Sequence, residues 1–241
     1  MSLRRQMRYG KVRQGRAVMV QLILAALFWL VSHFGLAAPA ARAPLVAKLT
    51  ENGFRALYSI VSLVALVLLI LAWRHAPEIP LWQPPLLLWP LFLLLMLAAC
   101  ILLIGAFSRA NPTAPGPIKP DYAVRGMQRI TRHPGLWAFA LWAVVHLLAN
   151  GNLSAVIFFA TFLATALIGM VAIDHKLAAR NPTLAAKLRA ETSIVPFAAI
   201  ATGRNHIVLS EIGLIPTLGG LVLFLVLLFL HHSVIGVSPL P

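Results

Sequence analysis

Residues 135–173 read GLWAFALWAVVHLLANGNLSAVIFFATFLATALIGMVAI, and this stretch decides the fold class. It holds two apolar runs, 135–148 and 153–173, that contain no Lys, Arg, Asp or Glu. Between them lies Ala149-Asn150-Gly151-Asn152, a cluster of residues typical of a tight turn. In a bilayer, a single segment satisfies its backbone polar groups only as a helix, and about 20 uncharged residues are enough to cross. The stretch therefore predicts two membrane helices packed as an antiparallel hairpin, the first of them short.

Four more runs of the same kind lie elsewhere in the chain, at Val18–Pro39, Phe54–Trp73, Leu86–Phe107 and Ile212–Leu230. The composition agrees, because 60% of the 241 residues are hydrophobic, 11% are charged and the mean hydropathy is +0.87. An average soluble domain is about 25% charged. These values exclude an ordinary soluble enzyme, a disordered chain and a disulfide-rich scaffold. They predict an all-α, polytopic membrane helical bundle of about six transmembrane helices.

The basic residues report the topology of this bundle. Twenty Lys and Arg against six Asp and Glu give a net charge of +14. Loops 1–2, 3–4 and 5–6 share one membrane face and hold thirteen of the twenty: Arg42, Lys48, Arg55, Arg109, Lys119, Arg125, Arg129, Arg132, Lys176, Arg180, Lys187, Arg189 and Arg204. Short cytoplasmic loops collect Lys and Arg. We therefore expect these loops to be cytoplasmic, with the lipid bilayer and no nucleic acid as partner.

The N-terminal tail contradicts that pattern, because residues 1–18 carry six of the remaining basic residues. We interpret residues 1–18 as a basic tail, with Met19 as an alternative start of the protein. Residues 19–230 form the predicted transmembrane domain, and residues 231–241 form a C-terminal tail. A cleaved signal peptide is less consistent with the sequence, because the first apolar run is long enough to span the membrane.

Ionisable residues inside membrane spans are costly, so each one suggests a function. We place all six carboxylates in loops or at span edges, which disfavours a pump that relies on membrane carboxylates. Histidine is the exception, because His33 lies within the first span and His146 within the fourth. The single cysteine, Cys100, excludes both an internal disulfide and a cysteine-based metal site.

Two histidines on different helices suit a bis-histidine haem, which needs one imidazole from each of two facing helices and apolar packing around the ring. Trp29 lies one turn before His33, and Trp142 one turn before His146. A hydrogen bond between helices is the alternative interpretation. His33 lies roughly 9–13 Å and His146 roughly 18 Å from the inner face at about 1.5 Å per residue. A pair of His33 with His133 is therefore a geometric rival.

Two basic sites could bind an anionic group. Arg55 shares a polar helix face with Ser59 and Ser62, beside Tyr58, and Arg55 or Tyr58 would bind a carboxylate such as a haem propionate. The alternative is helix packing through small residues with a snorkelling arginine. Arg132 and His133 precede Pro134, which fits the first turn of a helix, so they lie at a positive helix end where an anion would bind. The alternative there is simple anchoring by basic residues.

The loops carry two further signals. Asn111–Pro117 is too rich in proline to be helical throughout. Asn181-Pro182 is typical of an N-cap followed by proline in the first turn, and it predicts a short amphipathic helix over Pro182–Ala190 on the membrane surface.

The segment Thr131–Gly151, TRHPGLWAFALWAVVHLLANG, resembles the signature of the NnrU family. Two weaker likenesses, Arg55–Leu63 and Thr192–Ala199, extend the resemblance from about Met19 to Ile200. The resemblance implies a bacterial inner-membrane protein associated with denitrification, that is, with nitrite and nitric oxide reduction.

The same domain is similar to plant and cyanobacterial zeta-carotene isomerase, a membrane protein in which two histidines hold a b-type haem. This likeness implies His33 and His146 as axial ligands of a haem b iron, with His133, Arg132 and Arg55 supporting the cofactor or its propionates. The isomerase carries a cysteine three residues before the second histidine, where this chain has Ala143. That difference weakens a thiolate ligand-exchange mechanism and leaves bis-histidine ligation in place.

We therefore expect a haem b-binding membrane protein that acts in denitrification, nitric oxide metabolism or membrane redox chemistry, with respiratory or denitrification enzymes as its protein partners. Three alternatives stay open. The first is a cis–trans isomerase of polyenes, and the second a non-catalytic accessory protein of a respiratory reductase. The third is an S-adenosylmethionine-dependent methyltransferase, because Arg132-His133-Pro134 resembles a motif of membrane enzymes of that kind. Those enzymes have paired glutamates farther along the chain, where this protein has only Glu191.

Overall fold

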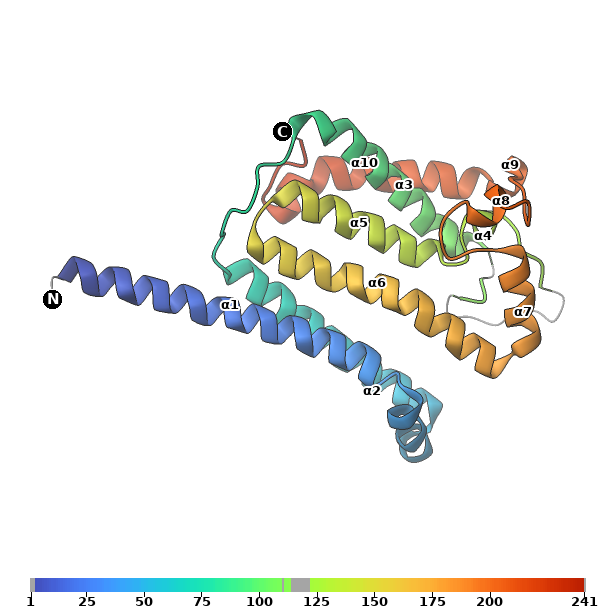
Figure 1. The fold of residues 1–241 in the computed structure, drawn as a ribbon, viewed down its shortest axis with the longest axis horizontal. Coiled ribbons are helices and arrows are strands. Elements are labelled where there is room, and N and C mark those ends of the chain that lie inside the picture. Colours follow the sequence, from blue (N-terminus) through green and yellow to red (C-terminus); the bar gives the residue numbers. More distant parts are fainter. Residues whose placement is uncertain (1–2, 110, 114–121, 241) are drawn as a thin grey trace. The chain divides into compact units, whose positions relative to one another are not determined.

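The computed structural model describes residues 3–109, 111–113 and 122–240, and the helix is the only extended regular element in this part of the chain (Figure 1). The prediction of an all-α protein is confirmed. The helices are α1 (Leu3–Gly35), α2 (Pro39–His75), the 3₁₀ turn η1 (Leu86–Leu88), α3 (Trp89–Ser108), α4 (Met127–Ile130), α5 (Pro134–Asn150), α6 (Leu153–Arg180), α7 (Pro182–Glu191), α8 (Ala198–Ala201), α9 (Leu209–Ile212) and α10 (Leu214–Ile235).

Five of the described segments are long and apolar enough to cross a membrane: Gly15–Gly35, Pro39–His75, Leu86–Ser108, Leu153–Arg180 and Leu214–Ile235. The sixth apolar helix, α5, is shorter, as the sequence predicts. Large apolar side chains on these helices face outward; Leu94 and Val222, for example, are 62% and 60% exposed. Such side chains are expected where the surroundings are lipid. The chain is a multi-pass membrane protein.

The helices differ from the predicted spans in three places. The predicted loop between the first two spans is mostly helix, because α2 begins at Pro39 and turns at Thr50, whose backbone (φ 63°, ψ 170°) is not helical. The first helix begins at Leu3, so it crosses the predicted junction at Met19 without a break. The last helix continues to Ile235, into the predicted C-terminal tail. Within the segment Asn111–Pro117, residues 111–113 are not helical, and the rest lies outside the described residues.

Contacts divide the chain into two compact units. The first unit consists of Met1–Pro84 with His146–Thr165, and the second of Pro85–Val145 with Ala166–Pro241. The helices α5 and α6 each contribute to both units.

In the first unit, α1 packs along α2, and the extended segment before η1 fastens the turn between α5 and α6. Leu81 N–H donates to Gly151 O (2.8 Å), and Leu153 N–H donates to Ile79 O (2.9 Å). The turn requires glycine, because Gly151 has φ +62° and an added Cβ would lie 2.1 Å from Trp82 O. The predicted tight turn of the hairpin is therefore present and is covered by a distant part of the chain.

In the second unit, α3 packs against α10. Gly220 lies directly on the backbone of Ile101, a close approach that small residues allow between membrane helices. The predicted helix at 182–190 is confirmed as α7, and Asn181 Oδ1 accepts the Leu184 N–H at 3.0 Å as its N-cap. Its apolar side packs on the chain itself, in a core formed by Tyr122, Val124, Leu177, Leu184, Ala185 and Leu188.

Candidate functional site

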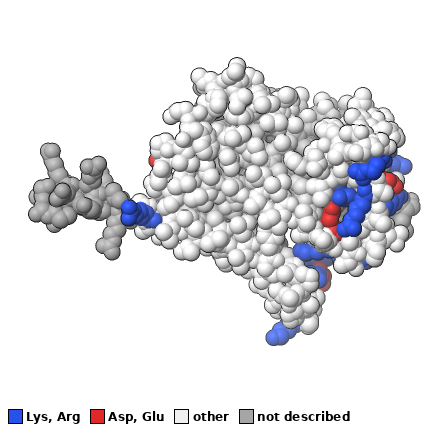
Figure 2. Space-filling model, in the orientation of Figure 1, with Lys and Arg blue, Asp and Glu red and all other residues white. Residues whose placement is uncertain are grey.

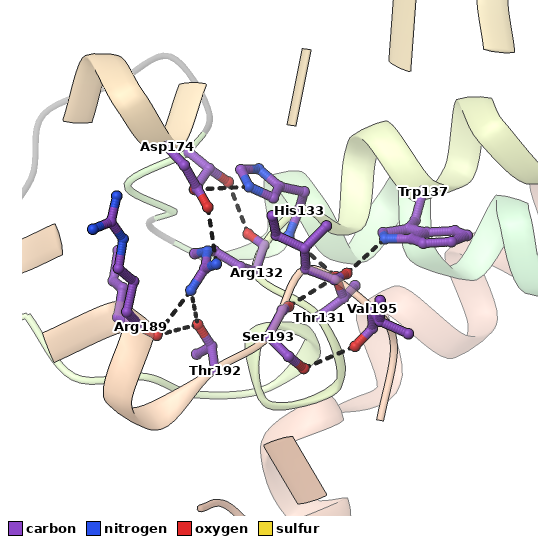
Figure 3. A network of polar contacts seen from close by, with 12 residues as sticks. Thr131, Arg132, His133, Trp137, Asp174, Arg189, Thr192, Ser193 and Val195 are labelled. Carbon is purple, nitrogen blue, oxygen red and sulfur yellow. Dashed lines mark hydrogen bonds and ion pairs between the residues drawn. The ribbon is translucent and has the colours of Figure 1, made fainter. Parts of the chain in front are cut away.

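Arg132 and His133 share one buried carboxylate in the second unit (Figure 3). Arg132 Nη2 lies 2.8 Å from Asp174 Oδ2, and His133 Nε2 lies 2.9 Å from Asp174 Oδ1. The side chains of Arg132, His133 and Asp174 are 7%, 0% and 11% exposed. An ionised Asp174 neutralises the guanidinium and favours the imidazole tautomer with its hydrogen on Nε2.

The backbone around these residues is fastened to the segment that follows α7. Arg132 N–H donates to Ser193 O (2.8 Å), and Thr131 Oγ1 donates to Ile194 O (2.8 Å). Trp137 Nε1 donates to the same carbonyl of Ile194 (2.8 Å) (Figure 3). The structure thus joins the two sequence segments Thr131–Gly151 and Thr192–Ala199 at their N-terminal ends.

The fifth apolar run, predicted to end at Ile173 with Asp174 at its edge, belongs to a longer helix, because α6 continues to Arg180 and includes Asp174. A signal for this was present in the sequence. No proline or glycine follows Gly169 until Asn181-Pro182, so nothing ends the helix at Ile173. The apolar run ends at Ile173 although the helix does not, so Asp174, which pairs with Arg132 and His133, lies just beyond the uncharged residues.

Two nitrogen atoms of this network, Arg132 Nε and His133 Nδ1, are buried without a hydrogen-bond partner among the described residues. Neither atom reaches the surface, so the network is closed to an outside ligand in this conformation. The anion that sequence reasoning expected at this helix end is the chain's own Asp174. The network acts chemically as a positioning element that fixes the start of α5 against α6.

A second ion pair in the same unit escaped sequence reasoning. Arg129 Nε and Nη2 donate to the two carboxylate oxygens of Glu211, at 2.7 and 2.9 Å, and Gly126 N–H donates to Glu211 Oε2 at 2.9 Å. The hydrogen bonds from Arg129, which outweigh the cost of burial, lower the pKa of Glu211 to about 2. Arg129 Nη1 also donates to Asn205 Oδ1 (2.8 Å), so this pair connects α4 to the loop after α8.

His33 lies in the first unit, on α1. Its ring stacks on Trp29, with ring centres 3.9 Å apart, and meets the edge of Tyr58 at 5.7 Å. The hydroxyl of Tyr58 donates to His33 O at 3.5 Å. The side chain is half-buried, and its Nδ1 is buried without a hydrogen-bond partner among the described residues.

His146 lies in the same unit and borders the same aromatic cluster, which consists of Trp29, Trp73, Phe158, Phe159 and Phe162. Its ring centre is 5.0 Å from that of Phe159. At the other side of the cluster, Trp29 packs on Phe162 and donates to Thr165 Oγ1 at 2.9 Å. Phe159 and Thr165 are six residues apart on α6, or about 9 Å. His33 and His146 therefore contact the aromatic cluster at different heights along the axis of α6.

Arg55 is placed on the exposed surface of α2, where its side chain is 70% exposed and its Nε lies 3.1 Å from Glu51 Oε1. Glu51 also pairs with Arg42, earlier on α2. The five predicted site residues thus fall into two sets. His33, His146 and Arg55 belong to the first unit, and Arg132 and His133 belong to the second. Among the described residues, no group of three or more His, Cys, Asp or Glu could hold a metal ion.

The long apolar helices define a multi-pass α-helical membrane protein. The Arg132–His133–Asp174 network lies toward the C-terminal end of one of them, α6. The family model described as NnrU protein matches residues 21–239, and the chain belongs to the NnrU family.

Two curated relatives share part of the sequence. The chain is 35% identical over 82 residues to the 15-cis-zeta-carotene isomerase, chloroplastic, of Zea mays, which covers 34% of this chain and 22% of that protein. It is 36% identical over 80 residues to the protein of the same name from Arabidopsis thaliana, covering 33% and 22%. The chain thus matches about a fifth of the length of these relatives. No solved structure matches the chain.

Proposed function

We propose that this protein binds haem b through the histidines of its first unit and isomerises double bonds of a long apolar polyene in the membrane. The observation that carries the proposal is that His33 and His146, from two different helices, border one aromatic cluster. The likeness to two 15-cis-zeta-carotene isomerases supports the reaction class. Because that likeness covers a third of the chain, the substrate is part of the proposal.

The donor set suits haem. Imidazole is a common axial ligand of haem iron, and aromatic and apolar side chains surround both histidines. When bound, the iron would supply the redox-active centre that acts on the double bond. Because the two histidines meet the cluster at different levels, single substitutions decide whether one or both hold the iron.

A groove between α1 and α2 offers a place for part of an apolar chain. It has a volume of about 460 Å³ and is lined mainly by apolar side chains: Leu24, Ala25 and Phe28 from α1, and Leu68, Leu71 and Ala72 from α2. Gln21 and His75 are its polar members. Pockets of this size, mostly apolar with a few polar groups, are typical of small-molecule sites. In this proposal the groove orients the polyene.

The proposal is tested with haem-loaded protein in lipid vesicles that contain a 15-cis polyene, by following the isomers with chromatography. We expect A72W, which fills the groove, to slow isomerisation at least tenfold at unchanged haem content. The matched control V222W places the same ring on an exposed position of α10 and should leave the rate unchanged. Haem-loaded wild-type protein that converts none of the polyene would contradict the isomerase proposal.

The remaining functional predictions from the sequence are not part of this proposal. The roles in denitrification and beside a respiratory reductase stay predictions, as do the bacterial inner membrane and the cytoplasmic side of the basic loops. The methyltransferase alternative needs Arg132 to face a ligand, whereas its guanidinium is buried against Asp174. We therefore do not propose methyl transfer.

A further inference from the structure

We propose that Arg109 and Arg125 form a binding site for the phosphate of an anionic phospholipid, where α3 ends and α10 begins. The site lies wholly in the second unit and is independent of the haem and the polyene.

The two arginines meet at one small cavity. They line it together with Gly126, Gln128 and Glu211, and its volume of about 10 Å³ has room for about one water molecule. Arg109 covers the backbone next to Arg125, since a Cβ added to Gly126 would lie 3.6 Å from Arg109 Cδ and 3.8 Å from Arg109 Nε. The cavity is too small to hold a phosphate, so the proposal places the phosphate at its mouth, between the two arginines that line it.

The charge at this place is uncompensated. Glu211 is the acidic residue of the cavity, and both of its oxygens are taken by Arg129. Among the described residues, no carboxylate forms an ion pair with Arg109 or Arg125. Arg109, Arg125, Arg129 and Glu211 together leave two positive charges. Arginine donors in a forked arrangement match phosphate oxygens well.

A buried polar atom in the same cavity also lacks a partner. Gln128 is 4% exposed, its Nε2 donates to Asn111 Oδ1 at 2.5 Å, and its Oε1 has no hydrogen-bond partner among the described residues. An acceptor in this position is satisfied by a hydroxyl or a water bound with a ligand. Because Gln128 lines the cavity, a water held there beneath the headgroup would satisfy this oxygen, and phosphatidylglycerol, whose headgroup carries hydroxyls, would hold such a water.

The surroundings favour a lipid over a free phosphate. Four apolar side chains on the adjoining ends of α3, α9 and α10 are between 71% and 76% exposed: Phe107, Leu209, Leu214 and Ile215. The end of α3 and the start of α10 belong to membrane-spanning segments, at the level where lipid phosphates lie and acyl chains begin. In Figure 2, most of the visible face carries no charge, and the largest group of basic and acidic side chains lies over the region of α4, α7, α8 and α9. Basic pockets between membrane helices are known to bind anionic headgroups.

The test uses the purified full chain in detergent micelles, with thermal unfolding and native mass spectrometry as readouts. Phosphatidylglycerol, phosphatidylcholine and sodium phosphate are titrated separately into the wild type, R109Q/R125Q, R109K/R125K and the control R180Q, which removes an exposed charge from the end of α6. We expect phosphatidylglycerol to bind best and R109Q/R125Q to weaken it about 30-fold, at about tenfold per 1.4 kcal/mol and about 1 kcal/mol per arginine. The lysine variant should keep part of the affinity, and R180Q all of it.

Three results would overturn the proposal. One is equal binding of phosphatidylglycerol and phosphatidylcholine by the wild type. A second is the same loss of affinity in R180Q as in R109Q/R125Q. The third is protection by sodium phosphate alone that matches phosphatidylglycerol, which would assign the site to free phosphate. If R109Q/R125Q does not fold, R109K/R125K is the deciding variant. A site that binds phosphate through the forked donors of arginine must lose affinity for phosphatidylglycerol when lysine replaces arginine.

Discussion

Removing the carboxylate of Asp174 should destabilise the second unit strongly, because it leaves Arg132 charged and buried. Asp174 binds Arg132 at 2.8 Å and His133 at 2.9 Å, and both partners are nearly or fully buried. In the D174A variant neither partner has another acidic group among the described residues.

The expected loss of unfolding free energy in D174A follows from the contacts of Asp174 with Arg132 and His133. Hydrogen bonds to charged groups contribute about 1.5–3 kcal/mol each. Breaking a buried ion pair by removing one partner costs about 3–5 kcal/mol. For a chain of this size that corresponds to a decrease of about 10 °C in the unfolding temperature.

The assay is thermal unfolding in detergent micelles, followed by intrinsic tryptophan fluorescence. E51Q is the matched control, because Glu51 also pairs with two arginines but on the exposed surface of α2, where ion pairs add little. The double variant R132M/D174M tests the cause, since it replaces the buried pair by apolar groups and should recover much of the loss.

Two results would refute this reasoning. If D174A and E51Q unfold at the same temperature, the Asp174 carboxylate does not stabilise the fold. If R132M/D174M is as unstable as the sum of its single variants, the uncompensated charge is not the cause.

Three further predictions concern the backbone and the second ion pair. G151A should cost about 2 kcal/mol more than G203A, because both have positive φ but only the Gly151 methyl would meet Trp82 O; equal unfolding temperatures would exclude the clash. G220A should cost about 1–3 kcal/mol, because its Cβ would lie 2.5 Å from Ile101 Cα, whereas G169A, with only ordinary contacts, should be tolerated; the unfolding temperatures of the two variants are compared. Glu211, whose pKa is lowered to about 2, should add stability above about pH 4.5 that is lost as the pH falls toward 2, and E211Q should remove this dependence; an unchanged pH profile in E211Q would contradict the role of the pair.

The sequence predicts the membrane spans because each is a long uncharged run, and α5 and α6 form a hairpin because their turn residues are unmistakable. The sequence does not predict the start of α2, because the helical residues between Pro39 and Thr50 include charged side chains and do not form a long uncharged run. Proline in the first helical turn was a signal for that helix.

The site is predictable only in part. The motif around Arg132 and His133 stands out in the sequence, but their partner Asp174 lies 41 residues beyond His133 on another helix. The bonds from Arg132 and Thr131 to Ser193 and Ile194 also join distant segments, and they use backbone carbonyls that carry no sequence signal. Such pairings follow from tertiary packing and not from local pattern.

The most direct measurement of the proposed function is the absorption spectrum of the purified protein after expression with ample haem, in the wild type and in H33A, H146A and H206A. His206 is an exposed residue of the second unit and serves as the control. We expect a Soret band in the wild type and in H206A, and its loss or shift in both H33A and H146A. A wild type without a Soret band, or a band unchanged in both H33A and H146A, would contradict the proposed haem site.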